Sequence, residues 1–348
     1  MKHALPPAPS RAHSPIGIWS LELGASPPLC YHCLLMSDAN PTAAPAKKSK
    51  GAVFLQRLIS TVVLWAIVIA AMFSGSKTVS DWVFVAIMLA LTWTGLMEFY
   101  DMTEKRGLRV FRQWGIFGGL VLIGSTFFYL SMGLGEDVRV APAKAGDFET
   151  SIIVIWALGL CLLQVKHFND KDAFTALCTT FFGLIYVAWL LNFIQKINYF
   201  PFPDSAAAKS GPFYVLYFIL VTKFSDVGGY CAGSLFGRHK ACPNISPGKT
   251  WEGFTGAVLI SMGASVAFAH FLGDRMHGME TIHAVILGAI LGLAAIVGDL
   301  IESVFKRGSG VKDSGSYFPG IGGILDLLDS LLFNAPLMYL YLRHILTD

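Results

Sequence analysis

The residues that could do chemistry are concentrated in the last third of the chain, around two apolar segments. Asp299, Glu302 and Lys306 are spaced i, i+3 and i+7, which places them on one face of a helix. Asp326 and Asp329 repeat the i, i+3 spacing at the start of the next apolar segment. Carboxylate oxygens are the ligands that hard divalent cations prefer, and such cations stabilise phosphate charge. Two helix ends therefore have the ingredients to hold a divalent metal, with magnesium favoured, and a polyphosphate.

The segment between these helix ends is rich in cations and glycine. It contains Lys306, Arg307 and Lys312, then Asp313 and a Pro-Gly-Ile-Gly-Gly turn at 319–323. A simpler interpretation is that Asp326 and Asp329 only complement the dipole of their helix, each contributing about 0.3–1 kcal/mol. Four acids in two apolar helices make that account incomplete. The expected catalytic group is Asp299, Asp326, Asp329, Lys306, Lys312 and Asp313.

A second polar cluster interrupts the sixth apolar segment of the chain. Lys223, Ser225 and Asp226 lie within it, and a charge at the centre of a membrane-spanning helix costs roughly 2.5 to 3.5 kcal/mol. Lys223 and Asp226, three residues apart, could neutralise each other. The alternative, which we favour, is that they line a polar cavity.

The loop after this segment has the residue types of a phosphate-binding site. Ser246, Gly248, Lys249 and Thr250 combine exposed backbone N–H groups, hydroxyls and a cation. This is not a Walker A loop, because Pro243 stands where the first glycine is required. A solvated basic loop remains the alternative interpretation.

The elements that must position these residues are membrane-spanning helices. Of the 348 residues, 54% are hydrophobic and 14% charged, and the mean hydropathy is +0.58, which excludes an ordinary soluble domain. The net charge of +3, without a basic run interleaved with aromatic residues, gives no nucleic-acid surface. Apolar stretches near the roughly 20 residues that span a bilayer predict nine helices, at 52–73, 79–100, 113–134, 150–166, 174–194, 212–235, 253–272, 282–301 and 324–346.

Three regions follow from this pattern. Residues 1–50 are rich in Pro, Ala, Ser and Lys and are expected to form a disordered tail without a signal peptide. Residues 51–210 are expected to hold the N-terminal transmembrane helices. Residues 211–348 are expected to form the catalytic transmembrane region with its polar loops. The predicted fold class is all-α and polytopic.

Lysine and arginine are distributed unevenly between the two sides of this arrangement, and basic loops are retained in the cytoplasm. With the N-terminus inside, the cytoplasmic segments hold Lys47, Lys48, Lys50, Lys105, Arg106, Arg109, Arg112, Lys166, Lys171, Arg238, Lys240, Lys249, Lys306, Arg307 and Lys312. The outer segments hold Lys77, Arg139, Lys144, Lys196, Lys209, Arg275 and Arg343. The predicted location is the inner (cytoplasmic) membrane, with the active site facing the cytoplasm.

Three motifs follow one another in the second half of the chain. They are D-V-G-G-Y-C-A-G-S-L-F-G-R-H from Asp226, S-P-G-K-T-W-E-G from Ser246, and S-V-F-K-R-G-S-G-V-K-D-S-G-S-Y-F-P-G-I-G-G-I-L-D-L-L-D from Ser303 to Asp329. In this order they resemble the CTP:phosphatidate cytidylyltransferases, the CDP-diacylglycerol synthases. The motifs cover about 220–345. The resemblance implies that the chain, in the bilayer, converts CTP and phosphatidate to CDP-diacylglycerol and pyrophosphate in phospholipid biosynthesis.

The same resemblance implies roles for particular residues. It implies Mg²⁺ as cofactor, with a second metal ion and a homodimer left open. The metal ligands it implies are Asp299 and Asp326, followed by Asp329 and Asp226. The substrate contacts it implies are Lys249, Lys306, Arg307 and Lys312, with hydroxyls from Ser246 and Thr250 and with Lys223 and Asp226 beside them. Two positions depart from the family pattern: Ile321 replaces a histidine and Leu327 an arginine.

Three alternatives remain: a CTP-dependent polyprenol or dolichol kinase, another CDP-lipid synthase and a transporter. A kinase must deprotonate an alcohol, and the K-R-x-x-x-x-K-D run from Lys306 argues against it. A transporter is typically built from inverted repeats with paired broken helices. Here the chemistry is crowded into the last third.

The predicted orientation can be tested by cysteine labelling. In a cysteine-free background, Gly310→Cys should resist membrane-impermeant thiol reagents in intact cells, because its loop is predicted to be cytoplasmic, whereas Ala206→Cys should react. Labelling of Gly310→Cys from outside would contradict the orientation.

Overall fold

The computed structural model describes residues 76–131, 142–167, 169–200, 210–310 and 323–346, the side chains of 142–145 excepted. These residues all belong to one compact unit, Ser49–Asp348. The predicted tail, the first predicted helix at 52–73, and Lys312, Asp313 and Ile321 lie outside the described residues.

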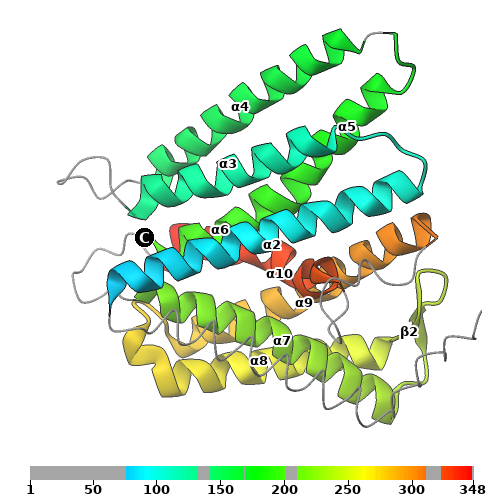
Figure 1. Ribbon diagram of the computed structural model, residues 1–348. Coiled ribbons are helices and arrows are strands. Elements are labelled where there is room, and N and C mark those ends of the chain that lie inside the picture. The colour runs from blue at the N-terminus through cyan, green and yellow to red at the C-terminus, as the bar shows by residue number, and fades with distance from the viewer. Residues whose placement is uncertain (1–75, 132–141, 168, 201–209, 311–322, 347–348) are drawn as a thin grey trace, which may run out of the picture. The chain divides into compact units, whose positions relative to one another are not determined.

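Eight helices in the described part are long and apolar enough to cross a membrane. The first four (Figure 1) are α2 (Lys77–Lys105), α3 (Arg112–Ser131), α4 (Pro142–Lys166) and a continuous span of α5 (Ala173–Gly183), η2 (Leu184–Trp189) and α6 (Leu190–Asn198). The others are α7 (Ser210–Phe236), α8 (Trp251–Leu272) with η4 (Gly273–Arg275), α9 (Thr281–Gly308), and α10 (Ile324–Tyr341) with η5 (Leu342–Leu346). Each corresponds to a predicted apolar segment, so the all-α polytopic fold is confirmed.

Polar residues do not break α7, which continues as one helix through Lys223, Ser225 and Asp226. The interruption in the sequence is therefore one of hydropathy alone. The helix can stay intact because the charges have partners within the bundle, described below.

Helix α10 is the most enclosed of the eight spans, with 67% of its apolar window buried, compared with 17% for α4 and α8. It packs against α9, α6, α2 and α7. Its fully buried residues include Leu325, Leu332 and Met338. The acids at its start are consequently held in a well-packed frame rather than on a mobile surface.

A short hairpin connects α7 to α8. Strands β1 (Lys240–Cys242) and β2 (Ser246–Thr250) pair antiparallel, with Lys240 opposite Thr250. The chain enters α8 directly from β2, so the phosphate-type residues of the loop lie on an ordered strand beside a helix start.

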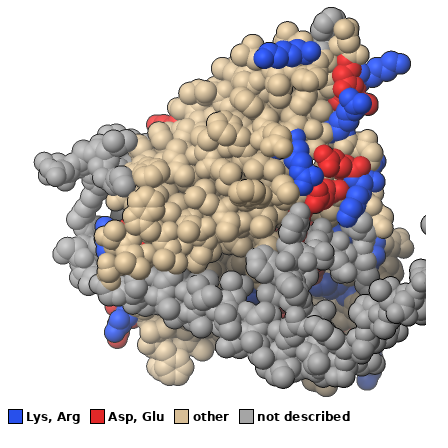
Figure 2. All heavy atoms as spheres, in the orientation of Figure 1, with Lys and Arg blue, Asp and Glu red and all other residues tan. Residues whose placement is uncertain are grey.

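Charged side chains gather at one end of the helices, on the right of Figure 2, where α2 ends and α3 begins. Arg112 pairs there with Asp101 at 2.6 Å and with Glu104 at 3.2 Å, and Arg109 pairs with Asp170. The hairpin and the α9 C-terminus lie at this same end in Figure 1.

Helices α7 and α8 approach closely through small residues, so their packing gives a direct test of the fold. A Cβ atom on Gly228 would lie 2.6 Å from Ile260 Cβ and 2.7 Å from the Gly256 carbonyl oxygen, whereas one on Gly263 would meet nothing within 4 Å among the described atoms. We expect Gly228→Val to destabilise the purified protein by about 1–3 kcal/mol through overpacking. Gly263→Val is the matched control. Equal melting temperatures for the two variants would contradict this packing.

Candidate active site

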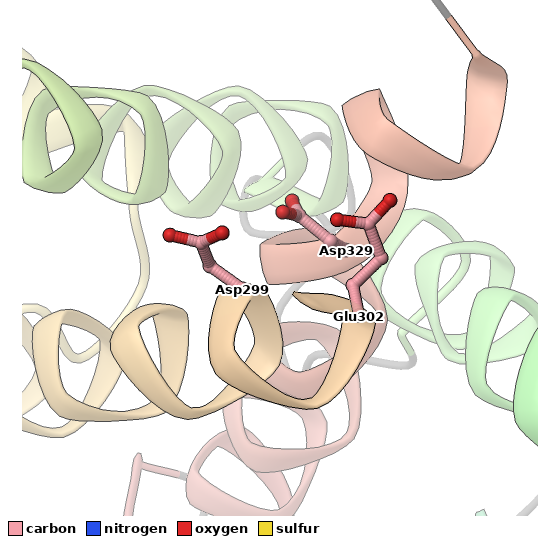
Figure 3. Close-up of side chains that lie close together, drawn as sticks. All are labelled: Asp299, Glu302 and Asp329. Carbon is pink, nitrogen blue, oxygen red and sulfur yellow. The ribbon is translucent and has the colours of Figure 1, made fainter. Parts of the chain in front are cut away.

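Three carboxylates from two helices form an acidic cluster, defined here as Asp299, Glu302 and Asp329. One oxygen of each lies within 4.8 Å of the others. Asp299 and Glu302 project from α9 and Asp329 from α10, as Figure 3 shows. Glu302 and Asp329 are buried, while the Asp299 side chain is 25% exposed. Protein therefore encloses Glu302 and Asp329, and Asp299 is the member of the cluster that is partly exposed.

The acidic cluster borders a cavity of about 530 Å³. Asp299, Asp326 and Asp329 line it from α9 and α10, and Asp226 lines it from α7. The hairpin and the start of α8 add Ser246, Gly248, Lys249, Thr250 and Gly253. The acids of the cavity thus come from α7, α9 and α10, whereas the hairpin and the start of α8 contribute its lysine, together with hydroxyls and glycine backbone.

Two lysines balance the acids. Lys249 of β2 forms an ion pair with Asp299. Lys306 lies between two carboxylates, with its Nζ 2.6 Å from Glu302 Oε2 and 3.1 Å from Asp326 Oδ1. Carboxylates this close repel one another strongly where the local dielectric is low, so nearby cations are needed to hold them together.

Lys223 and Asp226 are also paired, at 3.4 Å. The Lys223 ammonium in addition donates to the Leu327 carbonyl at 3.1 Å and lies 3.5 Å from Ser330 Oγ, so it connects α7 to the first turns of α10. The two charges thus neutralise each other, and Asp226 lines the cavity, whereas Lys223 lies outside its lining.

The hairpin is anchored at the base by side chains. Glu252 accepts from His239 Nδ1 at 2.7 Å and from the His239 backbone N–H. Thr250 is the N-cap of α8, its hydroxyl accepting from the Gly253 N–H at 3.1 Å, a bond that satisfies one of the free donors at a helix start. These contacts fix the strand that carries Lys249 and Ser246.

The acidic cluster fits a divalent cation. Within the described part of the chain, the second oxygen of Glu302, Oε1, is buried without a hydrogen-bond partner. A buried polar atom left unpaired is costly, and a carboxylate oxygen even more so. Three all-oxygen donors suit a hard metal ion rather than zinc or copper. Asp299, Glu302 and Asp329 are the residues that would hold it.

The predicted site residues converge to a large extent. Asp299, Asp326, Asp329, Asp226, Lys249, Ser246 and Thr250 line one cavity, and Lys306 and Lys223 contact its acids. Arg307 lies outside the cavity lining and donates from Nε to the Ile245 carbonyl at 3.3 Å. Lys312 and Asp313 lie outside the described residues. Asp326 lines the cavity but is not one of the three clustered acids, so its role as a metal ligand stays a prediction.

Two buried acids near the cavity are absent from the predicted ligands. Glu302 was placed on the face of Asp299 but was not included among the ligands, although the i, i+3 spacing was the available signal. Glu98, one of two acids in the second predicted apolar segment, is not among the predicted site residues. It is fully buried and contacts the start of α10, and an acid inside an apolar span is a signal of function by default.

The eight apolar spans form a bundle with a cavity lined by carboxylates, a lysine and hydroxyls, which are the residue types of a membrane-embedded enzyme that acts on phosphates. Comparison with known sequences gives the family: the profile of the Cytidylyltransferase family matches residues 55–345. The chain therefore belongs to the cytidylyltransferase family and is a nucleotidyltransferase and an integral membrane protein, as predicted.

Relatives support the same assignment. A phosphatidate cytidylyltransferase of Staphylococcus aureus (strain COL) is 43% identical over 257 residues, 73% of this chain and 90% of that protein. One from Haemophilus influenzae is 30% identical over 289 residues, 81% of this chain and 96% of that protein. The uncharacterized protein YnbB of Escherichia coli (strain K12) is 36% identical over 165 residues, 47% of this chain, and the match spans about half of its length (51%).

The metal assignment can be tested by the magnesium response of variants at Asp299 and Asp326. Asp299→Asn removes a charge from the acidic cluster, so we expect magnesium chloride to lose its stabilising effect on the melting temperature, since a bound ligand stabilises only the form that binds it. Asp326→Asn should keep that effect if Lys306 is the main partner of Asp326, and lose it if Asp326 is also a ligand. An unchanged magnesium response in both variants would contradict the site.

Proposed function

We propose that this protein is a phosphatidate cytidylyltransferase that makes CDP-diacylglycerol and pyrophosphate from CTP and phosphatidate. The observation that carries the proposal is the convergence of the acidic cluster and Lys249 on one cavity in a chain of the cytidylyltransferase family. The names of the two bacterial relatives matched over most of their length support the lipid substrate.

The reaction joins two anions. An oxygen of the phosphatidate phosphate attacks the α-phosphorus of CTP, a new P–O–P linkage forms, and the bond to the β-phosphate breaks to release pyrophosphate. A phosphate monoester is mostly deprotonated near neutral pH, so the chain needs no strong base. Most of the catalytic work is the management of charge and position.

The acids of the helices and the polar residues of the hairpin have different roles in this reaction. A magnesium ion bound by Asp299, Glu302 and Asp329 would supply positive charge to the triphosphate. Lys249 would then exchange its contact with Asp299 for a phosphate oxygen, while Ser246 and Thr250 donate hydroxyl hydrogen bonds beside it. Lys306 holds Glu302 and Asp326 in place, at 2.6 and 3.1 Å.

The location of the site also belongs to the proposal. The hairpin and the C-terminus of α9 lie at the end of the helices where charged side chains gather. We assign this end to the cytoplasmic face of the inner membrane, where CTP is available and lysine and arginine are retained. The lipid substrate would enter from the bilayer, with its phosphate at the level of the acidic cluster. A second metal ion and a homodimer stay predictions.

The direct test is an assay of the purified, detergent-solubilised protein with labelled CTP and phosphatidate. We expect lipid-extractable cytidine and an equal amount of pyrophosphate, dependent on magnesium. We also expect dCTP to serve, since it differs from CTP only at the 2′-hydroxyl, and ATP and GTP to fail. Transfer of a γ-phosphate to a lipid alcohol, without pyrophosphate release, would overturn the proposal in favour of a kinase.

A further inference from the structure

Glu98 is a buried carboxylate to which the proposed reaction gives no role. It lies in α2, 0% exposed. Its Oε1 accepts the backbone N–H of Ile324 at 2.9 Å and its Oε2 accepts that of Leu325 at 2.8 Å. These are the first two residues of α10. One side chain therefore satisfies two of the N–H donors that a helix start leaves free.

The bond is well suited to fix a helix in place. A carboxylate at a helix N-terminus is favoured by the helix dipole, and hydrogen bonds to an ionised group are stronger than neutral ones. The position before α10 is Gly323, which has no side chain to cap the helix. The carboxylate comes instead from a residue 226 positions earlier in the chain. It thus tethers α10 to another helix in addition to capping it.

The tether acts on the part of α10 that carries the site. Asp326 follows Leu325 directly, and Asp329 lies one turn further along. Lys306 of α9 also reaches the first turn, through Asp326 at 3.1 Å, but it contacts a side chain, whereas Glu98 holds the helix backbone. Lys223 contacts the Leu327 carbonyl and Asn334 contacts Thr222 at 2.5 Å, further along the helix. Those contacts hold the helix laterally against α7, while Glu98 holds its first turn against α2.

We propose that Glu98 is a positioning residue for the metal site. By holding the first turn of α10, it sets where Asp329 and Asp326 lie relative to Asp299 and Glu302 on α9. For its catalytic consequence this inference rests on the proposed function, whereas its effect on cation binding rests on the acidic cluster alone.

Glu98→Gln is the first variant to test. It replaces one acceptor oxygen with an NH₂ group that faces a backbone N–H, so one bond is lost and the other loses its charge. We expect the magnesium concentration that gives half of the full thermal stabilisation to rise about tenfold, and turnover to fall about 100-fold, as a displacement of about 1 Å at a reacting group can cause.

Glu149→Gln is the matched control. Glu149 is also a buried carboxylate, 2% exposed, but it pairs with Lys196 at 2.8 Å and bonds Asn192, away from the acidic cluster. The same substitution there should lower the melting temperature. It should leave the half-saturating magnesium concentration within about twofold of the wild-type value, since distant sites act independently.

Glu98→Asp separates positioning from capping and carries the test if Glu98→Gln does not fold. Aspartate keeps the negative charge at the helix start, but its carboxylate reaches one methylene less far. If Glu98 only offsets the helix dipole, Glu98→Asp should bind magnesium like the wild type. If it positions α10, the half-saturating magnesium concentration should rise several-fold, toward the roughly tenfold change expected of Glu98→Gln.

The outcomes are distinguishable from failure of the proposed function. A wild-type magnesium response in Glu98→Asp and in folded Glu98→Gln would overturn the positioning role, whatever the reaction. A wild-type protein that transfers no cytidylyl group, together with a weakened magnesium response in the Glu98 variants, would overturn the proposed function and leave the positioning role supported.

Discussion

Negative charge gathered inside an apolar helix bundle is the constraint on which the rest of the site depends. Asp299, Glu302 and Asp329 bring oxygens within 4.8 Å of one another, and such a group is strongly unfavourable without compensating charge. The chain supplies that compensation from separate elements: Lys249 from the hairpin and Lys306 from the end of α9. Because the acids are concentrated there, this position in the bundle favours a cation. A cation bound there would in turn attract a polyphosphate.

The remaining architecture keeps those charges in register. Helix α10 is the most enclosed span, so the acid it contributes is fixed by packing on several sides. Close glycine contacts let α7 and α8 run side by side, and the hairpin between them projects Lys249 across the cavity toward Asp299. The acids belong to helices and the phosphate-type residues to an anchored strand. This arrangement gives each half of the cavity a rigid support, as catalysis by charge and position requires.

The sequence predicted the elements better than their mutual rotation. Hydropathy located all eight described spans, because the length of an apolar run is a local property. The i, i+3 spacing predicted the shared face of Asp299 and Glu302. It could not decide whether Asp326 or Asp329 faces them, since the rotation of α10 is set by packing with other helices. The Lys249–Asp299 pair and the contact of Glu98 with Ile324 join residues far apart in the chain, and no local pattern encodes them. The β1–β2 pairing was expected only as a loop.

The central claim is that the acidic cluster of α9 and α10 is the metal site of a membrane-embedded cytidylyltransferase. Anomalous X-ray scattering from manganese tests it most directly, in crystals of the full chain grown with manganese chloride and CTP. The account predicts that the strongest anomalous peak is coordinated by oxygens of Asp299, Glu302 and Asp329, with the CTP phosphates beside it and Lys249 turned toward them. An ordered manganese–CTP complex bound elsewhere, with Lys249 still paired to Asp299 and Lys306 to Glu302, would contradict it.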